Sequence, residues 1–187
     1  MNRLRSPLFS IGLGLALICL LLDLSSIASA QNYPPMPRIE GESFSGRKVV
    51  IPGDLSGKIG VLVLGFSKAS KAQTAAWADR LEADYGTQPA IALYQLPVLE
   101  DVPSLVRGMV ISSIRKSVPE KKREQFVPVL HGEKELKSAV HFQEKDDAYL
   151  ILLDRTGAIV DQKHGEPNDE RYSRLREHIK SLLNAKQ

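Results

Sequence analysis

Cysteine, whose thiol carries most protein redox chemistry, occurs once in this chain of 187 residues, at Cys19. A thiolate nucleophile, a disulfide bond and a cysteine-ligated zinc site all need a sulfur atom. Cys19 lies inside an apolar run near the N-terminus, which has the pattern of a secretory signal. Removal of that signal leaves no thiol, so we expect the mature protein to do no thiol redox chemistry.

Two serines and two lysines stand together in the stretch Ser67-Lys68-Ala69-Ser70-Lys71, between an apolar run and a predicted helix. Either Ser67 or Ser70 can cap the helix, because a serine oxygen accepts from the free N–H groups of a first turn. A helix N-terminus also attracts anions. With Lys68 and Lys71 beside it, this turn is a candidate site for a carboxylate or a phosphate. The alternative is that the serines only cap the helix and the lysines are solvated.

A second group of basic residues lies further along the chain. Its members are Arg107, Arg115, Lys116, Lys121, Lys122 and Arg123. Such a group can bind anionic lipid headgroups or an acidic partner. Glu120 and Glu124 dilute the charge, and a solvated helix face explains the same pattern.

Other kinds of site find little support. The four histidines, at positions 131, 141, 164 and 178, are far apart and lack the short spacings of zinc sites. Ser67 is not in a Gly-x-Ser-x-Gly motif, and no nucleotide-binding loop is present. A net charge of +3, spread along the chain, does not indicate nucleic acid. We therefore assign no catalytic residue, no metal and no cofactor.

The N-terminus reads as a secretory signal. Arg3 and Arg5 precede an apolar run over residues 8–22, and Ala28-Ser29-Ala30 gives a cleavage site after Ala30. The run is shorter than the ~20 residues that span a bilayer. We expect an exported protein, in the periplasm or at the outer face of the cytoplasmic membrane. An uncleaved signal that anchors the protein is the alternative.

The rest of the chain is long enough for one domain with its own core. Residues 31–47 contain three prolines and are predicted to form an extended arm. Residues 48–187 are predicted to form the domain. Apolar runs indicate strands at 48–51, 59–66, 90–96, 148–153 and 158–162. Helical spacing indicates helices ending near 85, 118, 140 and 184.

The apolar residues of two of these helices keep helical spacing. Trp77, Leu81 and Tyr85 recur every four residues and predict a core-facing stripe, although a tryptophan can also mark a binding groove. In the next helix, for which Asp101 is a candidate cap, the apolar positions have the same kind of spacing. They are Val102, Leu105, Val106, Met109, Val110 and Ile114.

The order of elements predicts an α/β fold with a mixed central β-sheet flanked by helices. A β-α-β unit followed by a C-terminal β-hairpin and a closing helix resembles the thioredoxin-like arrangement. Residues 117–147 then form an insertion before the hairpin.

The stretch from Ile51 to Lys58, with the strand ending at Phe66, resembles membrane-associated thioredoxins and peroxiredoxins. In those families a Cys-x-x-Cys motif or a peroxidatic cysteine follows that strand. Here Ser67-Lys68-Ala69-Ser70 stands in its place. The cis-proline that normally precedes the hairpin strand is also missing, because Asp146-Asp147-Ala148 occupies the position. The resemblance therefore implies the fold without redox catalysis.

A second resemblance is to the mitochondrial ATP synthase assembly chaperones and their bacterial relatives. It covers roughly residues 45–183 and rests on three motifs: Gly65-Phe66-Ser67-Lys68-Ala69-Ser70 with Trp77, the stretch 114–120, and the stretch 149–154 with Gly157. It implies a non-redox thioredoxin-like protein that binds another protein, often a membrane subunit. The mitochondrial members carry a matrix-targeting sequence, whereas this chain carries a secretory signal.

Our leading hypothesis is a non-enzymatic, chaperone-like module that binds a protein partner at the cell envelope, with a membrane-complex subunit as one candidate partner. The proposed binding residues are Ser67, Lys68, Ser70, Lys71, Arg107, Arg115 and Lys116, and contact with a membrane surface is one expected use of the basic group. Two alternatives stay open: a degenerate thioredoxin- or peroxiredoxin-family enzyme, and a small-anion binder, both using the Ser67–Lys71 turn.

Overall fold

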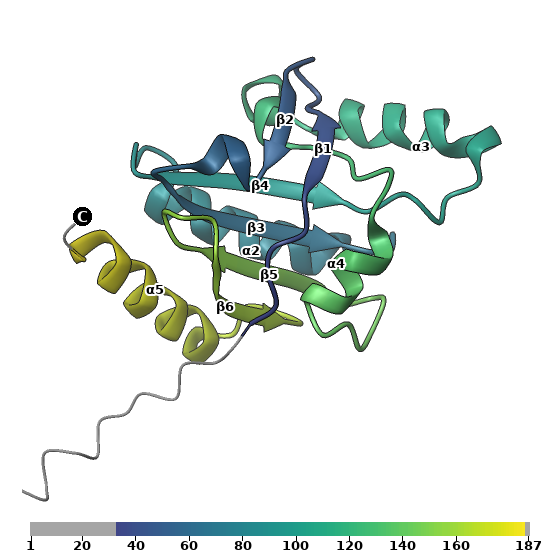
Figure 1. The fold of residues 1–187 in the computed structure, drawn as a ribbon. Helices are drawn as coiled ribbons and strands as arrows, with labels where there is room; N and C mark the ends of the chain where they lie inside the picture. Colours follow the sequence, from purple (N-terminus) through teal and green to yellow (C-terminus); the bar gives the residue numbers. More distant parts are fainter. Residues whose placement is uncertain (1–32, 186–187) are drawn as a thin grey trace, which may run out of the picture. The chain divides into compact units, whose positions relative to one another are not determined.

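The computed structural model describes residues 33–185 of the chain (Figure 1). The predicted signal, residues 1–30 with Cys19, lies outside the described residues. Within residues 33–185, no helix is both long enough and apolar enough to cross a membrane.

The apolar runs of the sequence form a four-stranded sheet in the order β4-β3-β5-β6 (Figure 1). The strands are β3 (Ile59–Gly65), β4 (Ile91–Pro97), β5 (Ala148–Leu153) and β6 (Ile159–His164). β3 is parallel to β4 and antiparallel to β5, which is antiparallel to β6. The central strands β3 and β5 are buried on both faces, which explains why their sequences are apolar without alternation. The predicted mixed sheet is confirmed.

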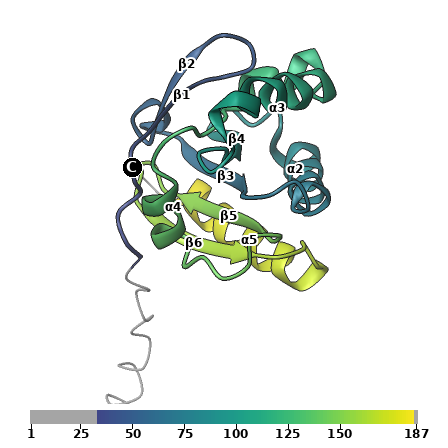
Figure 2. The same ribbon diagram turned by 90° about the vertical axis from the view of Figure 1, so that its right-hand side faces the viewer.

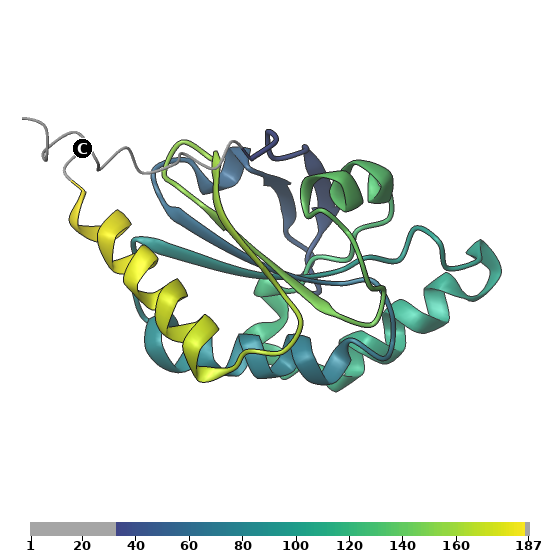
Figure 3. The ribbon, with the colours of Figure 1, turned by 90° about the horizontal axis from the view of Figure 1, so that it is seen from below.

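Elements cover both faces of this sheet (Figures 2 and 3). On one face lie α2 (Lys71–Tyr85) and α5 (Asp169–Asn184). On the other lie α4 (Glu133–Ala139) and a hairpin of β1 (Ile39–Glu42) and β2 (Lys48–Ile51). Two hydrophobic cores result, one on each side of the sheet. This is the predicted thioredoxin-like α/β sandwich.

The stripe on α2 faces the core, as predicted. Trp77 has no exposed surface and Leu81 is 1% exposed. The indole N–H of Trp77 donates to the carbonyl oxygen of Gly165 at 2.8 Å, so the buried polar atom is satisfied. Trp77 is therefore a core residue and not part of a groove. Asn168 caps α5 as its side chain accepts from the N–H of Arg171.

The segment predicted as an extended arm, residues 31–47, differs from the structure where the structure describes it. Ile39 in β1 pairs with Ile51 in β2, and Met36, Ile39 and Phe44 are buried. The backbone N–H of Phe44 also donates to the carbonyl oxygen of Phe126. Residues 33–38 have no regular secondary structure, but Ile39 onward forms a hairpin because its apolar side chains enter the core.

The insertion at residues 117–147 protects an edge of the sheet. It contains the short helix η2 (Glu120–Gln125), then a segment beside β4, then α4. The N–H groups of Val127 and Val129 donate to the carbonyl oxygens of Gln95 and Pro97 at 3.0 and 2.9 Å. An uncovered edge strand invites pairing with other chains, and this segment covers β4.

The helix α3 (Ser104–Ser117) departs most from expectation. None of its residues is buried. Leu105 is 96% exposed, Met109 74% and Val106 43%. Figure 1 shows α3 extending beyond the β4 side of the sheet. The apolar spacing of this helix thus does not mark a core-facing stripe.

The start of α3 also differs from prediction. The helix begins at Ser104, with Pro103 at the N-cap position, and no side chain caps it. Asp101 lies before this point and instead pairs with Lys137 at 3.4 Å. A proline is tolerated at a helix start because the first N–H groups lack partners in any case.

We expect Leu81→Ala to lower the free energy of unfolding by about 2–5 kcal/mol, because it leaves a cavity in the core. The same change at an exposed site, Leu105→Ala, should alter it by less than about 0.5 kcal/mol. Urea unfolding followed by circular dichroism measures both. A comparable loss in the two variants would show that α3 packs against the core.

Candidate functional site

The candidate site lies at one end of the central sheet. Gly65 at the end of β3 is opposite Pro97 at the end of β4 and opposite Ala148 at the start of β5. The Ser67–Lys71 turn, the loop toward α3 and residues 146–147 therefore all lie at this end. This is the position after β3 at which redox proteins of this type carry cysteine.

The two serines of the turn bond to each other's backbone. The Ser67 hydroxyl oxygen accepts from the N–H groups of Ala69 and Ser70 at 3.0 and 3.2 Å. The Ser70 hydroxyl donates to the carbonyl oxygen of Ser67 at 2.9 Å. Ser70 is 1% exposed. The turn is thus closed on itself, and both hydroxyls have structural roles.

The prediction that the side chain of Ser67 or Ser70 caps α2 is wrong. Ser70 occupies the N-cap position, but its side chain makes no capping bond because its hydroxyl points back to Ser67. Ser67 is too early in the chain to serve the first turn, so it stabilises the preceding turn instead. Serine is favoured at helix caps and in turns for the same reason, and sequence alone does not distinguish the two uses.

Ser70 packs tightly against the end of β3. A Cβ atom added at Gly65 would lie 2.7 Å from the Ser70 hydroxyl oxygen and 3.2 Å from the Thr74 methyl carbon. Only glycine permits this approach without a shift of the turn. Gly65 therefore allows the turn to pack closely against the end of β3.

The two lysines of the turn are free. Lys68 and Lys71 are exposed, and neither side chain makes an ion pair or hydrogen bond within residues 33–185. The first turn of α2 holds no acidic residue, and the N–H groups of Ala72 and Gln73 have no acceptor in the described structure. The helix N-terminus and two lysines together make this end of the sheet positive.

Three side chains that the sequence did not single out complete the site. Gln73 accepts from the N–H of Ala148 at 2.8 Å and donates to Asp147 at 3.3 Å. Asp147 in turn lies 3.1 Å from Nδ1 of His164. Gln73 thus satisfies the backbone N–H of Ala148 at the start of β5. Gln73, Asp147 and His164 come from three separate parts of the chain, so no local sequence pattern predicts their contacts.

A cluster of aromatic side chains lies next to the Ser67–Lys71 turn. The ring of Phe66 contacts those of Phe142 and Tyr149, with centroids 5.0 and 5.4 Å away. The ammonium of Lys137 lies 5.0 Å from the Phe142 centroid, within range of a cation–π contact. Hydrogen bonding to Glu133 raises the pKa of Lys137. Phe66 and Phe142 are half-buried and Tyr149 is buried, and together they hold the insertion against β5.

The second basic group does not act as one site. The guanidinium of Arg107 donates to the carbonyl oxygens of Glu100 at 2.8 Å and of Val102 at 2.9 and 3.0 Å. Arg107 therefore holds the loop before α3 and is no free binding residue. Lys122 pairs with Asp79 at 3.5 Å.

Arg115, Lys116 and Lys121 of this group are exposed and without ion-pair partners in residues 33–185, and the first two belong to α3. Both are exposed in the last turn of α3, where positive charge is favourable beside the helix C-terminus. Neither has an ion-pair partner within residues 33–185.

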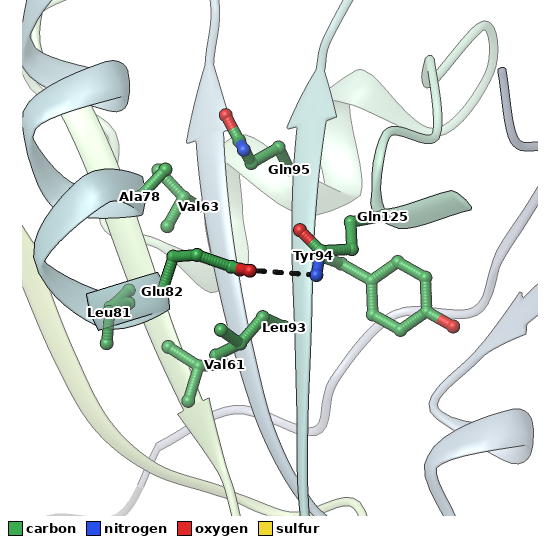
Figure 4. Close-up of a pocket in the computed structure, with 9 residues that line it drawn as sticks. All are labelled: Val61, Val63, Ala78, Leu81, Glu82, Leu93, Tyr94, Gln95 and Gln125. Atoms are coloured by element: carbon green, nitrogen blue, oxygen red, sulfur yellow. Dashed lines mark hydrogen bonds between the residues drawn. The ribbon is translucent and has the colours of Figure 1, made fainter. Parts of the chain in front are cut away.

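One cavity lies between α2 and β4 and another beside α4. The cavity between α2 and β4, shown in Figure 4, has about 10 Å³ of space, roughly enough for one water molecule. It is closed by a hydrogen bond of 3.3 Å from Gln125 to Glu82.

A larger, open pocket of about 300 Å³ is lined by Glu100, Asp101, Glu133, Lys134 and Lys137. Its carboxylates are engaged: Glu100 accepts from the N–H of Glu133, and Glu133 accepts from the N–H of Asp101. Within residues 33–185 no three histidine, cysteine, aspartate or glutamate residues are grouped to hold a metal ion.

Solved structures show the fold. The thioredoxin domain of a thiol-disulfide oxidoreductase from Bacteroides vulgatus is 16% identical with a TM-score of 0.55, over 78% of this chain and 96% of that one. An exposed lipoprotein thioredoxin from Streptococcus pneumoniae is 10% identical with a TM-score of 0.54, over 76% and 99%. A member of the Sco family of cytochrome c oxidase assembly proteins is 12% identical with a TM-score of 0.58, over 84% and 97%.

These similarities establish a thioredoxin-like fold and do not assign a function, because the identities are low. No protein-family model and no curated protein matches the chain. The resemblance to ATP synthase assembly chaperones therefore stays a prediction. The fold neighbours include thiol oxidoreductases, whereas residues 31–187 contain no cysteine.

We expect Gly65→Ala to cost about 1–3 kcal/mol of stability, because its Cβ clashes with the Ser70 hydroxyl. Ser70→Ala alone should cost about 1 kcal/mol, from one lost hydrogen bond. In the double variant the clash is relieved, so Gly65→Ala should cost less than it does beside serine. Denaturant unfolding of the four proteins measures this coupling.

Ser112→Ala, at an exposed position on α3, is the matched control. Its effect on the free energy of unfolding should simply add to that of Gly65→Ala. Strictly additive losses at Gly65 and Ser70 would contradict the closed turn.

Proposed function

We propose that this protein is a non-redox, protein-binding module of the cell envelope, with a chaperone-like or assembly role. One observation carries the proposal. The exposed turn that follows β3, where redox proteins of this fold carry cysteine, has two serines closed on each other and two lysines without partners. Such a turn can hold a partner, while it has no thiol and both of its hydroxyls are engaged.

Several features favour non-covalent binding of an acidic segment. The N–H groups of Ala72 and Gln73 point out from the start of α2, and Lys68 and Lys71 stand beside them. A carboxylate placed there gains charge-assisted hydrogen bonds. The segment could be an acidic side chain or the C-terminal carboxylate of the partner.

An assembly role is supported by analogy. The fold neighbour of the Sco family is described as a cytochrome c oxidase assembly protein, so this fold hosts assembly functions. The resemblance to ATP synthase assembly chaperones points the same way and suggests a membrane-complex subunit as client. One fold neighbour is an exposed lipoprotein, which is consistent with the export predicted from residues 1–30.

A second candidate, a small-anion binder, rests on the same open helix N-terminus. It predicts that phosphate or a simple carboxylate raises the melting temperature of the protein, and that Lys68→Ala/Lys71→Ala abolishes the rise. The degenerate-enzyme alternative requires peroxidase or reductase turnover that Ser67→Ala abolishes. The engagement of both hydroxyls does not favour it.

Cross-linking of the tagged full chain in its native envelope, followed by affinity capture, tests the proposal. We expect a recurrent protein partner, absent from an untagged strain. Lys68→Glu/Lys71→Glu should lower its recovery about tenfold or more, because two attractions become repulsions.

Lys58→Glu/Lys180→Glu is the matched control, with the same charge change at two exposed lysines away from the turn. It should leave recovery unchanged. Equal recovery by both double variants would remove the turn from the binding surface, and the absence of any recurrent partner would count against the function itself.

A further inference from the structure

The first two turns of α3 present large apolar side chains to solvent. Leu105 and Met109 are 96% and 74% exposed, and Val106 is 43% exposed. These three residues, which we call the apolar tip, lie on neighbouring positions of one helix surface, since residues three and four apart are adjacent. Grouped exposed apolar residues on a protein surface mark sites of contact with a partner or a membrane.

The helix is fixed with this surface outward. Arg107, on the opposite side, makes three hydrogen bonds to the carbonyl oxygens of Glu100 and Val102. Val110 and Ile114 are half-buried on that inner side. In this arrangement the apolar tip faces away from the half-buried side of α3.

The charged residues near the apolar tip indicate which kind of surface the tip contacts. The sequence of α3 contains no aspartate or glutamate. Arg115 and Lys116 stand in its last turn, and Lys121 is exposed just after it, all without ion-pair partners in residues 33–185. The nearest acids in sequence lie outside the helix: Asp101 is paired with Lys137, and Glu120 follows Pro119.

We propose that α3 docks on the surface of a lipid bilayer that contains anionic headgroups. An apolar surface combined with basic residues and no acidic ones is typical of helices that lie in the membrane interface. The apolar tip enters the boundary between headgroups and acyl chains, and Arg115 and Lys116 contact the phosphates. This site is separate from the Ser67–Lys71 turn and does not depend on the proposed partner.

The docking orients the molecule. The loop that leads to α3 and the Ser67–Lys71 turn leave the sheet at the same end, because β3 and β4 are parallel and end together. A docked α3 therefore turns that end of the sheet toward the membrane.

A site-specific fluorophore tests the docking in the full chain. Cys19→Ala removes the native thiol, and Met109→Cys then carries an environment-sensitive label on the apolar tip. Vesicles of equal parts phosphatidylglycerol and phosphatidylcholine should shift the label's emission to the blue, and spin-labelled lipid should quench it. The control label, at Ser173→Cys on the exposed side of α5, should change in neither way. The comparison separates α3 from any membrane contact made by residues 8–22.

The charge contribution has its own readout. Arg115→Glu/Lys116→Glu should weaken the emission response of the label at position 109 by about fivefold for each cation removed. Added salt should weaken it in the parent protein as well, because headgroup attraction is screened. Leu105→Ser should reduce the response at unchanged charge.

Three results would overturn the proposal. One is an unchanged emission at position 109 in the anionic vesicles. Another is an equal shift of the labels at positions 109 and 173. The third is a shift at position 109 that appears only with envelope proteins present, which would assign α3 to a protein partner.

Discussion

The pairing of β3 with β5 is the constraint on which the rest of the structure depends. Both strands are buried on both faces, so alternation of apolar and polar residues does not fix their register. A close approach at Gly60 does. A Cβ at Gly60 would lie 3.3 Å from both Cβ and Cδ1 of Leu153, the residue opposite it on β5. A slip by one residue would place a side chain in this contact, so the contact favours the register that sets Gly65 opposite Ala148.

That register builds the candidate site. Because Gly65 faces Ala148, the start of α2 reaches the start of β5, and Gln73 can satisfy the Ala148 N–H. The same geometry in a redox protein would present a thiol. Here it presents a closed serine turn in place of a thiol. Fold and function separate at this point, since function depends on the few side chains placed on a shared frame.

Much of this frame follows from the sequence, because buried strands and the helices that cover them have strong periodic signals. The sequence correctly predicts the strands β3, β4 and β5, the β5–β6 hairpin, and the helices α2 and α5. β1 is missed because the prolines before it suggest a linker, although its partner β2 is the next strand along the chain. The edge segment beside β4 is missed because it is short and follows a charged stretch. Contacts such as Gln73 with Asp147 join distant parts of the chain and have no local signal.

The prediction that the apolar residues of α3 face the core fails for a different reason, and this reason bears on function. Helical spacing of apolar residues reports that a helix is amphipathic, and does not report what covers its apolar side. Within residues 33–185 nothing covers Leu105 or Met109, and the inner side of α3 is only half-buried. The helix therefore adds little to the core, and folding stability does not explain its apolar tip. Arg107, on the opposite side, ties the helix to the loop before it with three hydrogen bonds. An apolar surface exposed to water, at the same end of the sheet as two unpaired lysines, supports the proposal that α3 docks on a membrane.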